Sequence, residues 1–188
     1  MAGTINIPTY LTIARIILTP AVIYLILSRS SVILTIVLFA VAAITDYIDG
    51  IIARKFGMVS RLGAHADMIA DRVLWAGSAA AMFFAYGLTG IFDTLRLFQL
   101  FAIMTRELIA APFALAAAIW WDPFPPARYV AKVTTMLQGF ALPALLLSVE
   151  YPVMLYLSTP LAGAILITGA WSAKLYIEDS REMNIPPP

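Results

Sequence analysis

Long apolar segments alternate with short polar connections along the chain, and this pattern predicts about six membrane-spanning helices. A helix needs about 20 mostly apolar residues to cross a bilayer. The predicted segments are residues 8–27, 31–54, 66–85, 94–120, 129–149 and 152–173, the fourth interrupted by Arg106 and Glu107. Gly87, Gly90 and Pro152 stand between the later segments, where breakers are expected. The pattern therefore predicts an all-α membrane protein, a bundle of about six transmembrane helices.

The composition supports the membrane interpretation. Of the 188 residues, 62% are hydrophobic and 12% are charged, whereas a soluble domain carries about 25% charged residues. The length predicts a single domain over residues 1–188. The absence of cysteine excludes disulfides and thiolate metal sites, and a net charge of +1 gives no support for nucleic-acid binding.

The basic residues predict the orientation of the chain in the membrane. Lysine and arginine accumulate in cytoplasmic loops. With the N-terminus inside, the inner connections hold most of the basic residues: Arg54, Lys55, Arg61, Arg128, Lys132, Lys174 and Arg181. The outer connections hold only Arg29 and Arg96. With no basic residue before Arg15, we also expect no cleaved signal peptide. The sequence predicts a multi-pass protein of the cell membrane, plasma or inner, with a cytoplasmic N-terminus.

Four aspartates are concentrated in one stretch of this apolar sequence. Asp46 and Asp49 lie near the end of the second segment, and Asp67 and Asp71 near the beginning of the third. Helix positions three, four or seven apart share a face, so each pair lies on one stripe of its helix. Because the connection over 55–62 is short, we expect antiparallel neighbours whose stripes face each other. The cluster would lie at the cytoplasmic side.

Four carboxylates that meet between two helices would repel one another unless cations neutralise them. Oxygen ligands suit hard cations, which favours Mg²⁺ or Mn²⁺ over Zn²⁺. Two such ions, about 3.5–4 Å apart, are the usual arrangement for phosphoryl transfer. Gly50, Ala53 and Gly63 would let a flat ligand approach the backbone, and Arg54 suits a diphosphate. Small residues also serve helix packing, and intramembrane acids also form proton relays or ion paths.

The full pattern, D-x2-D-G-x2-A-R-x8-G-x3-D-x3-D, resembles that of the CDP-alcohol phosphotransferase family. The chain matches it at all eight positions: Asp46, Asp49, Gly50, Ala53, Arg54, Gly63, Asp67 and Asp71. The chain length and the six predicted helices also agree with this family. Met68 and Arg72 depart from residues common in other members, but neither is a position of the pattern.

The resemblance implies a role for each residue of the pattern. Asp46, Asp49, Asp67 and Asp71 are expected to bind two Mg²⁺ or Mn²⁺ ions, with Asp71 also acting as general base. The base would deprotonate an acceptor hydroxyl that attacks the β-phosphorus of a CDP-linked lipid, and CMP would leave. The residues expected to contact CDP are Asp49, Gly50, Ala53, Arg54, Gly63 and Asp67. Relatives also commonly form homodimers.

Three further stretches resemble the phosphatidylglycerophosphate synthases, which use glycerol 3-phosphate as acceptor: residues 6–15, 105–107 and 132–138. A phosphorylated acceptor needs cations beside the metal ions. The predicted acceptor-binding residues are Arg106, Arg128, Lys132, Thr135 and Gln138. Lys132, Thr135 and Gln138 follow at three-residue spacing, which suggests one polar stripe. Arg106 could instead pair with Glu107, Arg128 could be a membrane anchor, and Arg15 is a further candidate.

Other functions stay open at this point. The acceptor could be inositol phosphate, phosphatidylglycerol or an archaeal ether-lipid substrate. An intramembrane prenyltransferase also binds diphosphate through aspartates and Mg²⁺, but such enzymes have more spans. From a different class, a small carrier or channel could use the acids as a cation path, although no internal repeat supports this. Trp75, Trp120, Trp121 and Trp171 are expected to anchor at the interface or contact lipid.

Overall fold

The computed structural model describes residues 7–55, 61–109 and 129–183, and every regular element in these ranges is a helix. Within them, the side chains at 7–16, 46–55, 61–69, 71, 176 and 180–183 are outside the description. The chain divides into two compact units, Met1–Thr89 and Gly90–Pro188, which are described separately. The predicted all-helical fold is confirmed, and the prediction of a single domain stays a prediction.

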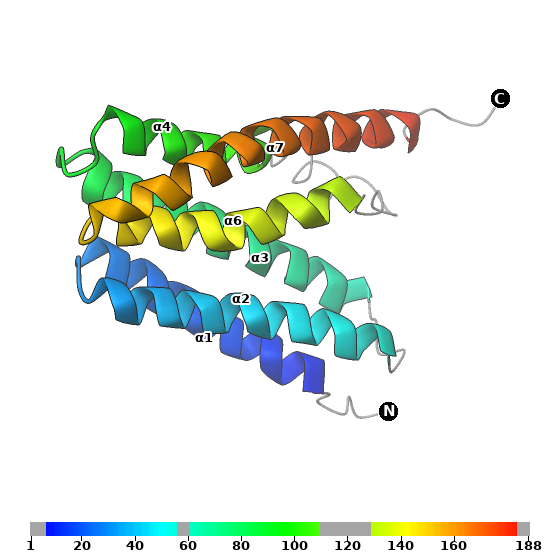
Figure 1. Ribbon diagram of the computed structural model, residues 1–188. Helices are drawn as coiled ribbons and strands as arrows, with labels where there is room; N and C mark the ends of the chain where they lie inside the picture. Colours follow the sequence, from blue (N-terminus) through cyan, green and yellow to red (C-terminus); the bar gives the residue numbers. More distant parts are fainter. Residues whose placement is uncertain (1–6, 56–60, 110–128, 184–188) are drawn as a thin grey trace. The chain divides into compact units, whose positions relative to one another are not determined.

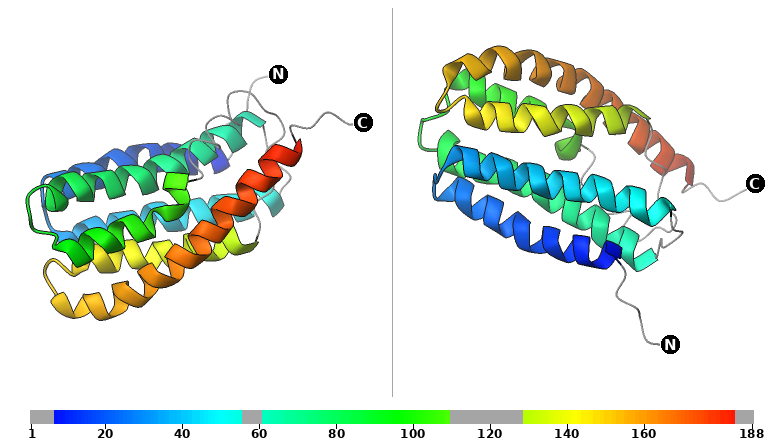
Figure 2. Two further views of the ribbon diagram at one scale, coloured as in Figure 1. Left: turned by 90° about the horizontal axis from the view of Figure 1, so that it is seen from above. Right: turned by 60° about the horizontal axis from the view of Figure 1, so that its bottom comes forward.

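The first unit is built around α1 (Ile7–Leu27), which packs against both α2 (Val32–Lys55) and α3 (Arg61–Met82). A π-helical turn, η1 (Phe83–Gly87), follows α3 directly. Figures 1 and 2 show α2 and α3 running in opposite directions, with the end of α2 near the beginning of α3. At Gly77 of α3, an added Cβ would come within 2.8 Å of Ile23 Cδ1 in α1. The missing side chain therefore lets these helices approach closely.

The second unit contains α4 (Thr94–Ile103), α6 (Tyr129–Leu147), η2 (Pro152–Met154) and α7 (Leu155–Met183). Figure 1 shows α7 along α6 and α4, and it packs against both. Gln99 of α4 joins it to α7 through two hydrogen bonds: Ser158 Oγ donates to Gln99 Oε1 at 2.7 Å, and Gln99 Nε2 donates to Thr159 Oγ1 at 2.7 Å. Such polar pairs hold helices together where the surroundings are apolar.

Arg96 ties the beginning of α4 to the end of α6. Asp93 caps α4 by accepting a hydrogen bond from the Arg96 N–H at 2.8 Å, and its other oxygen pairs with Arg96 Nη1 at 2.9 Å. The remaining guanidinium nitrogens donate to Ser148, Nε to its hydroxyl and Nη2 to its carbonyl, both at 3.0 Å. One side chain therefore satisfies groups at two helix ends.

The predicted fourth segment is broken by its backbone as well as by its charges. α4 ends at Ile103, and Met104 leaves the helical region with φ −89° and ψ 4°. Residues 105–109 are helical again, and the rest of the predicted segment lies outside the described residues. The other predicted bounds agree closely, except that α3 begins at Arg61 instead of 66 and α7 continues to Met183 instead of ending near 173. The Lys174–Glu178 pair, at 3.7 Å, lies in this polar extension.

Apolar side chains cover the outside of the helices as well as their packed faces. On α2, an outward stripe of Ile33, Val37, Val41 and Ile44 is 43–57% exposed, while Phe39 and Ala42 of the same helix are buried. By length and composition, two helices among the described residues could cross a membrane, Tyr129–Leu147 and Pro152–Asp179. Surfaces of this kind are rare in water and normal in lipid.

Candidate active site

The eight residues of the aspartate pattern lie on the two helices that the sequence assigned to them. α2 carries Asp46, Asp49, Gly50, Ala53 and Arg54 in its last turns, and α3 carries Gly63, Asp67 and Asp71 in its first half. Both helices are continuous through these positions, so the spacing does place each set along one stripe. The side chains themselves lie outside the description, and their metal and CDP contacts stay predictions.

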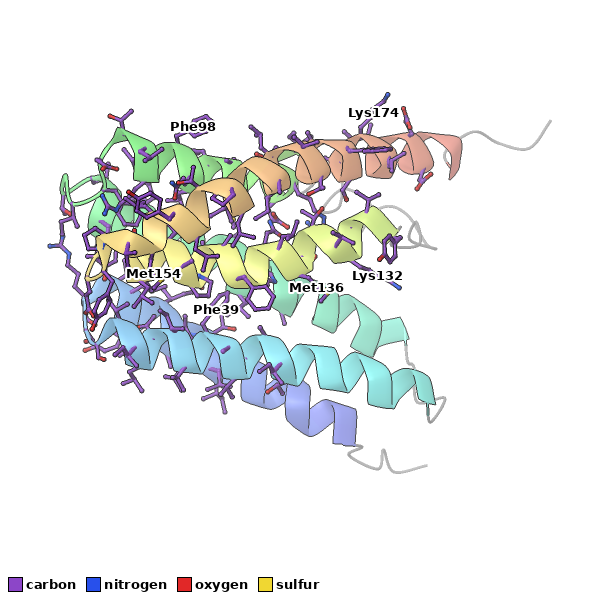
Figure 3. All side chains as sticks on the ribbon, viewed as in Figure 1. Phe39, Phe98, Lys132, Met136, Met154 and Lys174 are labelled. Atoms are coloured by element: carbon purple, nitrogen blue, oxygen red, sulfur yellow. The ribbon has the colours of Figure 1, made fainter. Side chains whose placement is uncertain are left out.

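A ring contact joins the same two stripes farther along the helices. Phe39 lies seven residues before Asp46 on α2, and Trp75 lies four residues after Asp71 on α3. Each aromatic residue is therefore on the stripe of the aspartates. The two rings meet edge to face, with centroids 5.1 Å apart and an interplanar angle of 84°. At this level the two stripes face each other (Phe39 is labelled in Figure 3).

The same contact corrects the interpretation of one tryptophan. Trp75 is expected to anchor at the interface or contact lipid, but only 5% of it is exposed, and its ring packs against Phe39 of α2. Trp171, by contrast, is 59% exposed, as a lipid-facing residue should be. Trp120 and Trp121 lie outside the described residues. Tryptophan in an apolar sequence thus had two possible environments, and only packing distinguished them.

Three of the predicted acceptor residues, Arg106, Thr135 and Gln138, form one hydrogen-bonded cluster with Glu107 in the second unit. Arg106 Nη1 donates to Thr135 Oγ1 at 3.0 Å and lies 3.3 Å from Glu107 Oε1. Gln138 Nε2 donates to Glu107 Oε2 at 2.6 Å and to the Ile103 carbonyl at 2.7 Å. The pairing of Arg106 with Glu107, an open alternative from the sequence, is therefore found together with a contact to α6.

The directions of these hydrogen bonds follow from the donors available. The Thr135 hydroxyl has one hydrogen, which it donates to the Ala131 carbonyl at 3.0 Å, so toward Arg106 it can only accept. The Gln138 amide nitrogen has two hydrogens, which match its two acceptors. Gln138 is fully buried, and its Oε1 has no partner among the described residues. The cluster therefore fixes Arg106 from α6.

Lys132 does not share the environment of Thr135 and Gln138. Lys132 is exposed in the first turn of α6 (Figure 3), Thr135 is half-buried and Gln138 is buried. At 3.6 residues per turn, a step of three residues falls about 60° short of a full turn, so two steps rotate the side chain by about 120°. The prediction that these three side chains lie on a single polar stripe is therefore wrong, because the helix turns them from solvent toward the interior. Arg128, and the side chain of Arg15, lie outside the description.

Glu107 is the residue of this cluster that the sequence interpretation left without a role. Its side chain is only 8% exposed, and it contacts both Arg106 and Gln138. An acid within a predicted span, next to an arginine, was the signal that could have found it. The contact with Gln138 spans 31 residues of sequence, which no local spacing reveals.

The comparisons with known proteins agree with the pattern. The CDP-alcohol phosphatidyltransferase family matches residues 5–173. The CDP-diacylglycerol--glycerol-3-phosphate 3-phosphatidyltransferase of Rickettsia typhi is 35% identical over 154 residues, covering 81% of this chain and 82% of the relative. The protein of the same name from Rickettsia prowazekii is also 35% identical, with 81% of each chain covered.

A more distant relative extends the agreement to another group of bacteria. A probable phosphatidylglycerophosphate synthase of Mycobacterium tuberculosis is 30% identical over 168 residues, covering 87% of this chain and 76% of the relative. The family match includes both helices that carry the aspartates and the helices that carry the Arg106 cluster. The protein described here therefore belongs to the CDP-alcohol phosphatidyltransferase family of membrane-associated transferases.

Proposed function

We propose that this enzyme transfers a phosphatidyl group from CDP-diacylglycerol to glycerol 3-phosphate and releases CMP, a step of phospholipid synthesis. The observation that carries the proposal is the 35% identity, over four fifths of the chain, to transferases named for these two substrates. The acceptor-like stretches at 105–107 and 132–138 support the same substrate, because part of them forms a hydrogen-bonded cluster that holds the guanidinium of Arg106.

The aspartates of α2 and α3 would provide the catalytic centre. Asp46, Asp49, Asp67 and Asp71 are oxygen donors on two antiparallel helices, which suits two Mg²⁺ or Mn²⁺ ions. The contact between Phe39 and Trp75 supports this arrangement, since it brings together the stripes that carry the four residues. Bound there, the ions would neutralise charge on the diphosphate. Arg54 would add a planar cation at the same phosphates, beside Gly50, Ala53 and Gly63.

Asp71 is the proposed general base. It would take the proton from the acceptor hydroxyl as the hydroxyl oxygen forms a bond to the β-phosphorus of the donor. The bond between that phosphorus and the oxygen of CMP would break, and CMP would leave as the anion. Asp71 lies one helical turn from Asp67, so it is placed beside the other ligands on the same stripe.

The acceptor phosphate would bind to basic residues of the second unit. Arg106 is the best-supported of these, because Thr135 and Glu107 already hold one of its nitrogens. Lys132, exposed at the start of α6, could add a second charge. We place the active site at the cytoplasmic side of a multi-pass protein with a cytoplasmic N-terminus. Homodimer formation is proposed from the family alone.

The test is CMP release by the purified protein in detergent with CDP-diacylglycerol and a panel of acceptors. The panel contains glycerol 3-phosphate, inositol phosphate, inositol, serine and phosphatidylglycerol. We expect release with glycerol 3-phosphate, loss of activity with EDTA, and recovery with Mg²⁺ or Mn²⁺. Release with another acceptor would keep the chemistry and change the substrate. If no acceptor gave CMP release, the panel would be repeated with an ether-linked CDP-lipid as donor. No release with that donor either would refute the transferase proposal and favour a cation path.

A further inference from the structure

We propose that Glu107 is a positioning residue of the acceptor site, whose buried carboxylate orients the guanidinium of Arg106 toward the acceptor phosphate. The inference rests on the proposed function, because the phosphate of the acceptor is the ligand that Arg106 would bind. Glu107 would not touch the substrate. Its effect would pass through Arg106, with Gln138 holding the carboxylate in place.

Glu107 is buried, and two side chains hold its carboxylate. A carboxylate that is 92% buried is stable as an ion only with close partners. Arg106 Nη1 lies 3.3 Å from Oε1, and Gln138 Nε2 lies 2.6 Å from Oε2, so each oxygen has a donor. The Arg106–Glu107 ion pair is therefore held in place by its surroundings and is not a surface ion pair.

The Arg106–Glu107 pair is anchored to two helices. Gln138 also donates to the carbonyl of Ile103, one of the last carbonyls of α4, which have no N–H donor inside that helix. A single amide thus joins Glu107, the end of α4 and α6. Gln138 therefore contacts the chain on both sides of the break at Met104, at the carbonyl of Ile103 and at the carboxylate of Glu107.

Part of the Arg106 guanidinium stays available to a ligand. Its side chain is 22% exposed, and its contacts with the described residues use Nη1 alone, through Glu107 and Thr135. The guanidinium is planar, so fixing one nitrogen fixes the directions of Nε and Nη2. Those two nitrogens have no hydrogen-bond partner among the described residues and can bind a phosphate in bidentate fashion.

The backbone of Arg106 is also in close contact with α7. Gly169 of α7 is buried, and an added Cβ there would lie 3.4 Å from the Arg106 nitrogen and 3.5 Å from its Cβ. α7 therefore packs directly on the backbone of the residue that α6 holds by its side chain. Side chain and backbone are both constrained, as a binding group that must be preorganised requires.

The test is the kinetics of Glu107→Gln in CMP release with glycerol 3-phosphate. The substitution keeps the shape and removes the charge. We expect the KM for glycerol 3-phosphate to rise about tenfold, since a hydrogen bond between charged partners is weakened. The KM for CDP-diacylglycerol should stay unchanged. In an Arg106→Ala background, Glu107→Gln should add little, because its effect passes through Arg106.

Gln99→Met provides the matched control. Gln99 is also a buried amide that joins two helices of the same unit, but it contacts Ser158 and Thr159 and not Arg106. It should lower thermal stability and leave the acceptor KM unchanged. If Gln99→Met and Glu107→Gln raised that KM equally, or if Glu107→Gln added its full effect to Arg106→Ala, the positioning role would be refuted.

A second variant keeps the inference testable if Glu107→Gln does not fold. Gln138→Met removes the hydrogen bond to Glu107 at similar volume, and it should raise the acceptor KM in the same selective way. An unchanged KM in an active Gln138→Met protein would then overturn the inference alone. Failure of the wild-type protein to use glycerol 3-phosphate would overturn the proposed function, and the inference with it.

Discussion

The polar residues of the two units are arranged in different ways. In the first, Asp46 to Asp71 lie within two helices that are adjacent in sequence, and the described contact between those helices is between two aromatic rings. In the second, hydrogen bonds made by buried and half-buried polar side chains connect α4, α6 and α7 across 29 to 60 residues of sequence.

The difference shows which kind of site a sequence can reveal. A stripe on a helix is a local property, because residues three, four or seven apart share a face in any regular helix. A cluster such as Arg106, Glu107 and Gln138 exists only when separate helices pack in one register. The first kind gives a pattern along the chain, and the second gives scattered polar residues in apolar segments.

The largest effect is expected from replacing the proposed general base, which lies in the first unit. Asp71→Asn should lower kcat about 10²- to 10⁴-fold, the usual contribution of a general base, with CMP release as the measurement. Asp93→Asn is the control, since asparagine also caps helices well and Asp93 lies in the other unit, at the start of α4. Normal turnover by Asp71→Asn would show that another group takes the proton.

A second pair of variants tests whether the contact of α7 with Arg106 matters. Gly169→Leu must place its side chain against the Arg106 backbone, while Gly163 has no atom within 4 Å of an added Cβ. Both substitutions gain helix propensity equally, so their difference isolates the contact. We expect Gly169→Leu to be less stable than Gly163→Leu by about 1–3 kcal/mol in detergent melts.

The kinetics of the same pair sharpen the comparison. Gly169→Leu should raise the KM for glycerol 3-phosphate, since it displaces the segment that carries Arg106, whereas Gly163→Leu should not. Equal melting temperatures and equal KM values for the two variants would mean that α7 does not constrain Arg106.

The smallest expected effect tests a polar contact of the second unit that has no proposed role in the reaction. Arg96→Lys keeps the charge but loses the planar fork that reaches Asp93 and both polar groups of Ser148. Stability should fall by about 1 kcal/mol, and both KM values should stay the same. Arg29→Lys, at an exposed turn of the other unit, is the control and should melt like the wild type. A selective change in one KM would place Arg96 in the site.

Much of the helical fold could be predicted from apolar length alone. The predicted starts at residues 8, 31, 94, 129 and 152 lie within one residue of the helices found. The end of α7 was missed because a helix does not have to stop where its apolar stretch stops. The break at Met104 was also missed, since neither glycine nor proline marks it. It lies directly after Ile103, whose carbonyl accepts a hydrogen bond from the distant Gln138.

The sequence by itself determined the family, the helical class and the stripes of aspartates, because each depends on residue type and local periodicity. Only the tertiary structure decided that Trp75 is buried, that Lys132 and Gln138 have different environments, and that Glu107 holds Arg106. The physical reason is that burial and hydrogen bonding in these cases depend on which helix lies opposite. A helical period fixes the direction of a side chain, but packing decides what it meets.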